Sequence, residues 1–145
     1  MTLPRFYIKR EKMSRIYILE DDPNRMKQFK PECIGHSMVH DDTAAGFIEK
    51  LQAEDQHIDV MFLDHDLGGE QFVSSADANT GMEVVRWLVN NKKNIGRIIV
   101  HTLNPPAGEE MVYRLKHAGY ETLQAPFLYL NFSGNLIENI VTTEE

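Results

Sequence analysis

The sequence has little cysteine: Cys33 is the only one, so no disulfide bond can form within the chain. Sparse cysteine is typical of proteins from a reducing compartment, which predicts a cytoplasmic location. No apolar run reaches membrane-spanning length, and the first residues have no apolar core of the kind found in secretory signals. We therefore expect no membrane partner.

Positive charge is also in short supply. The 15 lysines and arginines face 22 aspartates and glutamates, which gives a formal net charge of −7. Binding to an extended nucleic-acid backbone needs clustered positive charge, so this composition argues against that class of partner. A nucleotide or the phosphate at one RNA end remains compatible with it.

The 145 residues are enough for one domain with a hydrophobic core. Residues 1–12 continue no pattern, whereas Met13 opens the segment MSRIYILEDD, which resembles a natural start. We therefore predict an N-terminal extension over residues 1–13 and a single domain over residues 14–145. The alternative is an added edge strand at residues 6–8.

Short apolar segments alternate with amphipathic segments along the domain. The apolar segments predict buried strands at residues 15–19, 37–40, 60–63, 97–100 and 120–125. The amphipathic segments predict helices at residues 23–31, 43–51, 81–91, 108–117 and 134–142. This alternation is typical of an α/β fold with a parallel sheet covered on both faces. Residues 68–80 lack periodicity, and loops of that length are often functional.

Polar residues follow three of the predicted strands at the point where each strand ends. In chain order these are Glu20, Asp21 and Asp22, then Asp64, His65 and Asp66, then His101, Thr102 and Asn104. The carboxyl ends of parallel strands lie at one edge of a sheet, and ligands bind there in open α/β folds. The sequence therefore predicts a shared site at this edge.

The pattern resembles the receiver domains of two-component signalling. Those domains carry an acidic pair after the first strand, an Asp after the third, a Thr after the fourth and a Pro after the fifth. The matching residues here are Asp21 and Asp22, Asp64, Thr102 and Pro126. The resemblance implies a flavodoxin-like three-layer sandwich with strand order 2-1-3-4-5, and a Mg²⁺ ion held by the acidic cluster.

The sequence departs from signalling receivers at informative positions. Ala125 stands where they carry a Lys before the Pro, and His65 and His101 are unusual neighbours for the Asp and the Thr. The motifs LEDDPNRM, LDHDLGG and HTLN look closer to the cyclic-phosphate-processing receiver-like group of bacteria and phages. That resemblance implies action on the cyclic phosphate of an RNA end or a nucleotide.

Hydrolysis of a cyclic phosphate needs a base, an acid and positive charge on the phosphoryl oxygens. Imidazoles suit the proton transfers, and carboxylates suit Mg²⁺ or Mn²⁺. We predict His65, His101 and Asp64 as catalytic residues, Thr102, Asn104 and Asp66 as substrate-binding residues, and Asp21, Asp22 and Asp64 as ligands of a divalent metal.

Several of these residues also have a purely structural interpretation. Asp22 fits a helix N-cap, Asp66 fits a turn before two glycines, and His101 fits a core histidine with satisfied hydrogen bonds. Two other functions stay open: a non-catalytic module that binds a nucleotide signal or a protein partner, and a phosphoacceptor receiver. The resemblance is also compatible with a homodimer.

Overall fold

The computed structural model describes residues 13–142. The predicted extension, apart from Met13, and the alternative strand at residues 6–8 lie outside the described residues. Within residues 13–142, no helix has the length and apolar character needed to cross a bilayer.

The core of the domain is a five-stranded parallel sheet. Its strands are β1 (Arg15–Leu19), β2 (Ser37–Asp41), β3 (Ile58–Leu63), β4 (Ile95–Val100) and β5 (Thr122–Gln124). Their order in the sheet is β2-β1-β3-β4-β5. The predicted α/β, flavodoxin-like fold with order 2-1-3-4-5 is therefore confirmed.

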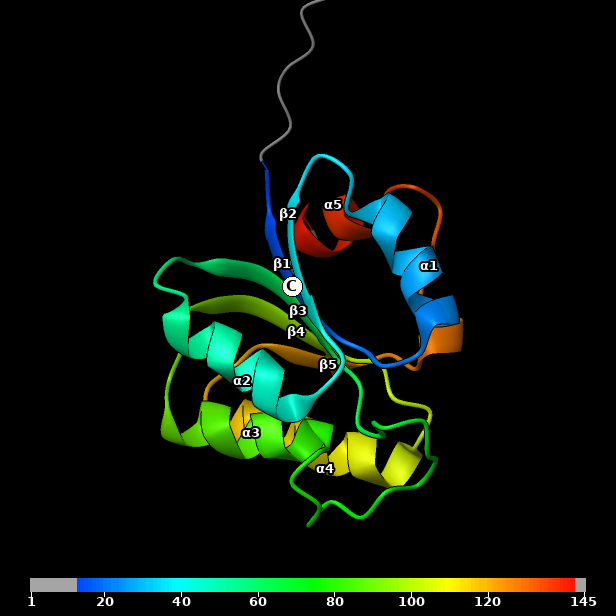
Figure 1. Cartoon of the computed structure of the whole chain (residues 1–145). Helices are drawn as coiled ribbons and strands as arrows, with labels where there is room; N and C mark the ends of the chain where they lie inside the picture. Colours follow the sequence, from blue (N-terminus) through cyan, green and yellow to red (C-terminus); the bar gives the residue numbers. More distant parts are fainter. Residues whose placement is uncertain (1–12, 143–145) are drawn as a thin grey trace, which may run out of the picture.

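Helices cover both faces of the sheet. They are α1 (Pro23–Glu32), α2 (Ala44–Ala53), α3 (Gly81–Asn90), α4 (Pro105–His117) and α5 (Leu136–Thr142), with a 3₁₀ turn η1 at Phe127–Tyr129. Figure 1 shows α1 and α5 on one face and α2, α3 and α4 on the other. The domain thus has the three layers that the sequence predicted.

Two hydrophobic cores result, one on each face, because side chains alternate along a strand. Tyr17 and Leu19 of β1 pack in the core under α2, α3 and α4. Ile16 and Ile18 of the same strand pack in the core under α1 and α5. The apolar character of β1 after Arg15 follows from this burial on both sides.

The start of α4 differs from the prediction. The helix predicted for residues 108–117 begins three residues earlier, at Pro105. Proline is well tolerated in the first turn, where its missing N–H would have no helical partner. Asn104 caps this helix, its side chain accepting a hydrogen bond from the Ala107 amide at 3.4 Å.

The ends of several other elements also shift. The central strand begins at Ile58, two residues before the predicted apolar run, and ends at Leu63 as predicted. The strand predicted for residues 120–125 is reduced to Thr122–Gln124. The final helix begins at Leu136 rather than at residue 134. At Asp64 the chain leaves the β3 ladder, so the polar residues that follow belong to a loop.

Gly81 is where this loop joins α3, directly against the end of β3. A Cβ atom at this position would overlap the carbonyl oxygen of Asp64 and would also lie 2.9 Å from Cε of Met111. We expect Gly81→Ala to destabilise the fold by about 1–3 kcal/mol, because neither the strand end nor the helix can move aside freely. Thermal unfolding followed by circular dichroism measures this loss.

Gly35→Ala is the matched control for Gly81→Ala. Gly35 has a positive φ of 87°, but a Cβ atom added there would meet nothing within 4 Å, so the substitution carries only backbone strain. Gly81→Ala should lower the melting temperature more than this control does. An equal or smaller loss at Gly81 would contradict the steric argument.

Candidate functional site

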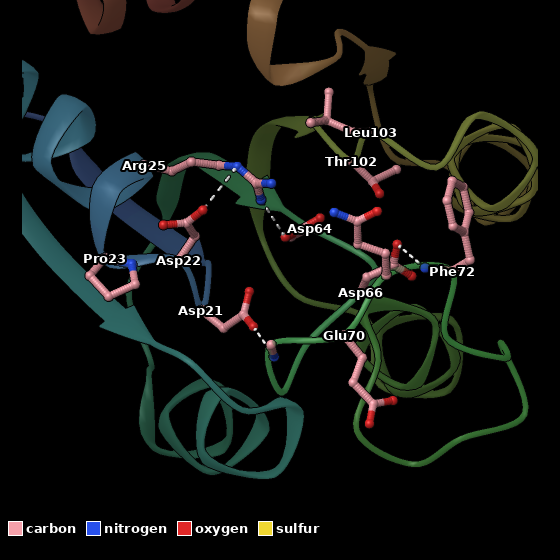
Figure 2. Close-up of a pocket in the computed structure, with 12 residues that line it drawn as sticks. Asp21, Asp22, Pro23, Arg25, Asp64, Asp66, Glu70, Phe72, Thr102 and Leu103 are labelled. Carbon is pink, nitrogen blue, oxygen red and sulfur yellow. Dashed lines mark hydrogen bonds and ion pairs between the residues drawn. The ribbon is translucent and has the colours of Figure 1, made fainter.

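A hollow of about 320 Å³ opens at the carboxyl ends of β1, β3 and β4, the edge that the sequence predicted. Figure 2 shows that acidic, basic and apolar side chains converge on it from different elements. Its lining is formed by Asp21, Asp22, Pro23, Arg25, Asp64, Asp66, Gly69, Glu70, Gln71, Phe72, Thr102 and Leu103.

Arg25 connects two buried carboxylates at the floor of the site. Its Nη1 atom lies 3.1 Å from Oε2 of Glu20 and 3.3 Å from Oδ2 of Asp64. Glu20 and Asp64 are almost fully buried, whereas about a quarter of the Arg25 side chain is exposed. The guanidinium group also lies over the Phe127 ring, 5.7 Å from its centroid. A cation therefore sits between the two carboxylates and reaches the hollow.

Asp64 is short of compensating charge despite this contact. Burial, and to a smaller extent the charge of Glu20, raises the pKa of Asp64 from its ordinary 3.8 to about 7. His101, Arg25 and the amide of His65, which donates to Oδ1 at 2.7 Å, only partly offset this rise. A carboxyl in this condition favours a proton or a further cation nearby.

His101 lies behind Glu20, away from the lining of the hollow. Its Nε2 atom lies 2.8 Å from Oε1 of Glu20, and the ring packs against Phe29, Phe62 and Phe127. Burial alone would raise the pKa of Glu20, but the hydrogen bond and charge of His101, with help from the Asp22 amide, hold that pKa below its ordinary value. His101 thus holds the Glu20 side chain in place and favours its ionised form.

Three buried side chains near the hollow could offer ligand atoms to a divalent cation. One ligand atom each from Glu20, Asp64 and His101 lies within 4.8 Å of the others. A metal-bound histidine normally donates its second ring N–H to an acceptor, yet Nδ1 of His101 has no partner among residues 13–142. The two carboxylates therefore fit an oxygen-seeking ion such as Mg²⁺ or Mn²⁺, with His101 orienting one of them.

The three predicted metal ligands occupy different parts of the hollow. Asp64 reaches the floor of the hollow, whereas Asp21 and Asp22 lie on its wall. Asp22 caps α1 by accepting from the Asn24 amide at 2.8 Å. Asp21 accepts from the Gly69 amide at 2.7 Å, which ties the loop after β3 to the loop after β1. Metal binding by Asp21 and Asp22 stays a prediction.

Asp66 and His65 anchor the long loop. Asp66 accepts from the amides of Phe72 and Val73 at 2.9 and 3.0 Å, and the His65 ring lies between Asp66 and Ser75 at 2.7 and 2.9 Å. Burial would raise the pKa of Asp66, but these hydrogen bonds, His65 first, hold it low. The His65 side chain is fully buried, so its bonds serve the loop that faces the hollow.

Thr102 and Asn104 lie in the segment between β4 and α4. Thr102 lines the hollow, and its hydroxyl oxygen accepts from the Asn104 amide at 3.1 Å, which leaves its O–H free to donate. Asn104 donates from Nδ2 to Asp66 at 3.3 Å in addition to capping α4. The structure thus brings Asp64, Asp66 and Thr102 to one cavity, with Asn104 supporting them.

Glu20 and Arg25 lie next to Asp64, yet neither was assigned a role from the sequence. Arg25 carried a usable signal, since a cation in the first turn of a helix opposes the helix dipole and suggests another partner. Glu20 carried none that separates it from Asp21 and Asp22, because three consecutive carboxylates look alike in one dimension.

The chain was compared with known proteins. The sequence profile described as "Cyclic-phosphate processing Receiver domain" matches residues 16–117, more than half of the chain. A search of curated protein sequences found no match to this chain.

Solved structures of receiver domains share its fold. A CheY-like response regulator receiver domain from Methanospirillum hungatei is 20% identical with a TM-score of 0.60, covering 89% of this chain and 91% of that one. The non-phosphorylated HemR receiver domain from Leptospira biflexa is 18% identical with a TM-score of 0.60, covering 91% and 97%. At these identities the likeness establishes the fold alone.

Proposed function

Because this chain belongs to the cyclic-phosphate-processing receiver domains, we propose that it hydrolyses a cyclic phosphate on an RNA end or a nucleotide, assisted by a divalent metal ion. The observation that carries the proposal is the convergence of Arg25, Asp64 and Thr102 on one hollow. In the reaction, a water oxygen bonds to phosphorus, one ribose oxygen leaves, and the water's proton ultimately reaches that oxygen through solvent.

Arg25 and Thr102 are the residues that we assign to the phosphate. The guanidinium of Arg25 is a planar, permanent cation with several donors, which suits two phosphoryl oxygens at once. The Thr102 hydroxyl can donate to a third polar atom of the substrate. Together they stabilise the negative charge that grows on the phosphoryl group as water attacks.

Glu20 and Asp64 are the residues that would hold the metal ion. Support comes from the raised pKa of Asp64, which reflects a buried carboxyl with too little positive charge around it. When bound, the ion would place positive charge against the phosphoryl oxygens and lower the pKa of an attacking water. Arg25, relieved of the two carboxylates, would then be available to the substrate.

We assign positioning roles to the two histidines predicted as catalytic. His101 holds Glu20 at 2.8 Å, and His65 holds Asp66 and Ser75 in the loop. Both imidazoles are fully buried, so a substrate in the hollow would meet the groups they orient rather than the rings themselves. Direct proton transfer by either ring stays a prediction.

The reaction can be tested with 2′,3′-cyclic nucleotides and oligonucleotides that end in a 2′,3′-cyclic phosphate. We expect phosphomonoester products in Mg²⁺ or Mn²⁺ and a much slower reaction in EDTA, because the positive charge facing the phosphate is then that of Arg25 alone. Chromatography with phosphorus NMR identifies which ribose oxygen leaves. Absence of turnover on every cyclic phosphate, with either metal, would contradict the proposal.

A phosphoacceptor role is the second candidate, favoured by the position of Asp64 after β3 and Thr102 after β4 in a CheY-like fold. Ala125 lacks the ammonium group that signalling receivers place before the proline. Acetyl phosphate with Mg²⁺, followed by intact mass measurement, separates the two. An adduct on Asp64 without cyclic-phosphate turnover would favour this candidate, and ligand binding without any product would favour a non-catalytic module.

A further inference from the structure

Phe72 is an aromatic side chain held in solvent at the mouth of the hollow. It is 69% exposed, although a phenylalanine would normally be buried, and it lines the cavity together with Leu103, which is 42% exposed. Figure 2 shows that Phe72 comes from the loop after β3 and Leu103 from the segment after β4. Two apolar side chains thus border a site whose floor is charged.

The backbone of Phe72 is held in an unfavourable conformation. Its φ is 55°, and it is the one residue other than glycine with a positive φ among residues 13–142. For a bulky side chain this conformation is strained and persists only where the surroundings impose it. Here the carboxylate of Asp66 imposes it by accepting from the Phe72 and Val73 amides at 2.9 and 3.0 Å.

Asp66, which holds the Phe72 backbone, is itself held by two further side chains. Asp66 also accepts from Nδ2 of Asn104 at 3.3 Å and lies 2.7 Å from the His65 ring. Ser75, further along the loop, is held by the other nitrogen of His65 at 2.9 Å. The backbone of Phe72 is therefore anchored to the segments that carry Asp64 and Thr102, so its side chain is presented at the mouth of the hollow.

We propose that Phe72 and Leu103 form a nucleobase subsite, in which the base of a nucleotide stacks on the Phe72 ring while its phosphate reaches Arg25 and Thr102. This inference rests on the proposed function and deepens it: the protein recognises the base of its substrate as well as the cyclic phosphate. An aromatic face binds every base, so recognition at this subsite tolerates different bases. The hollow of about 320 Å³ lies at the small end of ligand sites, which suits one nucleotide.

The test compares 2′,3′-cyclic AMP with methyl ribofuranoside 2′,3′-cyclic phosphate, which has the same cyclic phosphate and no base. Steady-state kinetics in Mn²⁺ gives kcat/KM for both compounds, and titration calorimetry gives their affinities. We expect the wild-type protein to favour the nucleotide about 10-fold or more, since stacking of one base on an aromatic ring supplies that much. Phe72→Ala should remove this preference, and Phe72→Trp should retain it.

Tyr129→Ala is the matched control, because Tyr129 is 80% exposed on η1 and does not line the hollow. It should leave the preference for the nucleotide unchanged, and melting temperatures confirm that each variant is folded. Equal use of both compounds by the wild-type protein would overturn the base subsite and leave the proposed hydrolysis standing. Binding and turnover of neither compound would overturn both.

Discussion

We expect Arg25→Met to lower kcat/KM for a 2′,3′-cyclic nucleotide by about 10²–10³-fold, the usual loss when one preorganised donor to a developing oxyanion is removed. Methionine keeps much of the length and apolar stem of arginine, so its contact with the Phe127 ring is largely preserved. The charge at the hollow is lost. Initial rates over a range of substrate concentrations measure the effect.

The same variant should bind Mg²⁺ or Mn²⁺ more tightly. Nη1 of Arg25 lies 3.1 Å from Glu20 and 3.3 Å from Asp64, and so competes with an ion for the same carboxylates. Calorimetric titration with Mn²⁺ alone, without substrate, reports this affinity independently of turnover. Slower turnover together with tighter metal binding would show that the variant has lost a phosphate contact while the rest of the site is intact.

Lys27→Met provides the control for Arg25→Met. Lys27 is an exposed cation on the same helix, so its loss changes the net charge equally without touching the hollow. Arg25→Lys should recover part of the activity, because an ammonium group restores the charge but not the paired donors. If Arg25→Met and Lys27→Met had the same kcat/KM, Arg25 would have no place in phosphate binding.

Asp64→Asn should make the metal-free protein more stable at pH 8, by about 5–10 °C in melting temperature. Burial raises the pKa of Asp64 to about 7, so at pH 8 the wild-type protein holds a poorly compensated buried charge that asparagine avoids. Asparagine keeps an oxygen that can accept from the His65 amide, now 2.7 Å from Oδ1. Thermal unfolding in EDTA measures the difference.

The gain should disappear as the pH falls toward 4. A carboxyl whose pKa rises on folding binds its proton more tightly in the folded state, so wild-type stability decreases as the pH rises from about 4 to about 7. Below that range Asp64 is protonated in both states, and the two proteins should melt together. An advantage of Asp64→Asn that is constant from pH 4 to pH 8 would contradict the assignment of the raised pKa.

Divalent metal should reverse the comparison. An ion bound to Glu20 and Asp64 adds the positive charge that Asp64 lacks, and a ligand that binds only the folded state raises the melting temperature. Mn²⁺ should therefore stabilise the wild-type protein at pH 8 and have little effect on Asp64→Asn, which should also have lost turnover. Equal stabilisation of both by Mn²⁺ would place the metal elsewhere.

The sequence alone was enough to predict the parallel sheet and the edge at which the polar residues gather, and the resemblance to receiver domains supplied the strand order. Alternating strands and helices leave few ways to pack an α/β domain. Burying polar side chains inside the core costs free energy, so a polar cluster directly after an apolar strand indicates the edge of the sheet. The sequence also predicted Asp22 as a helix cap and Asp66 as a turn residue, because both roles depend on neighbouring residues. The structure contains both interactions.

Which side chains contact one another could be seen only once the chain was folded. Glu20 rather than Asp21 or Asp22 reaches Asp64, because the turn between β1 and α1 sets the direction of each carboxylate. His101 leaves β4 on the face where Phe29 packs, so its ring lies in the core behind the site. Arg25 arrives from a helix, by the reach of a long side chain. These directions depend on backbone geometry across segments distant in sequence, which no local pattern specifies.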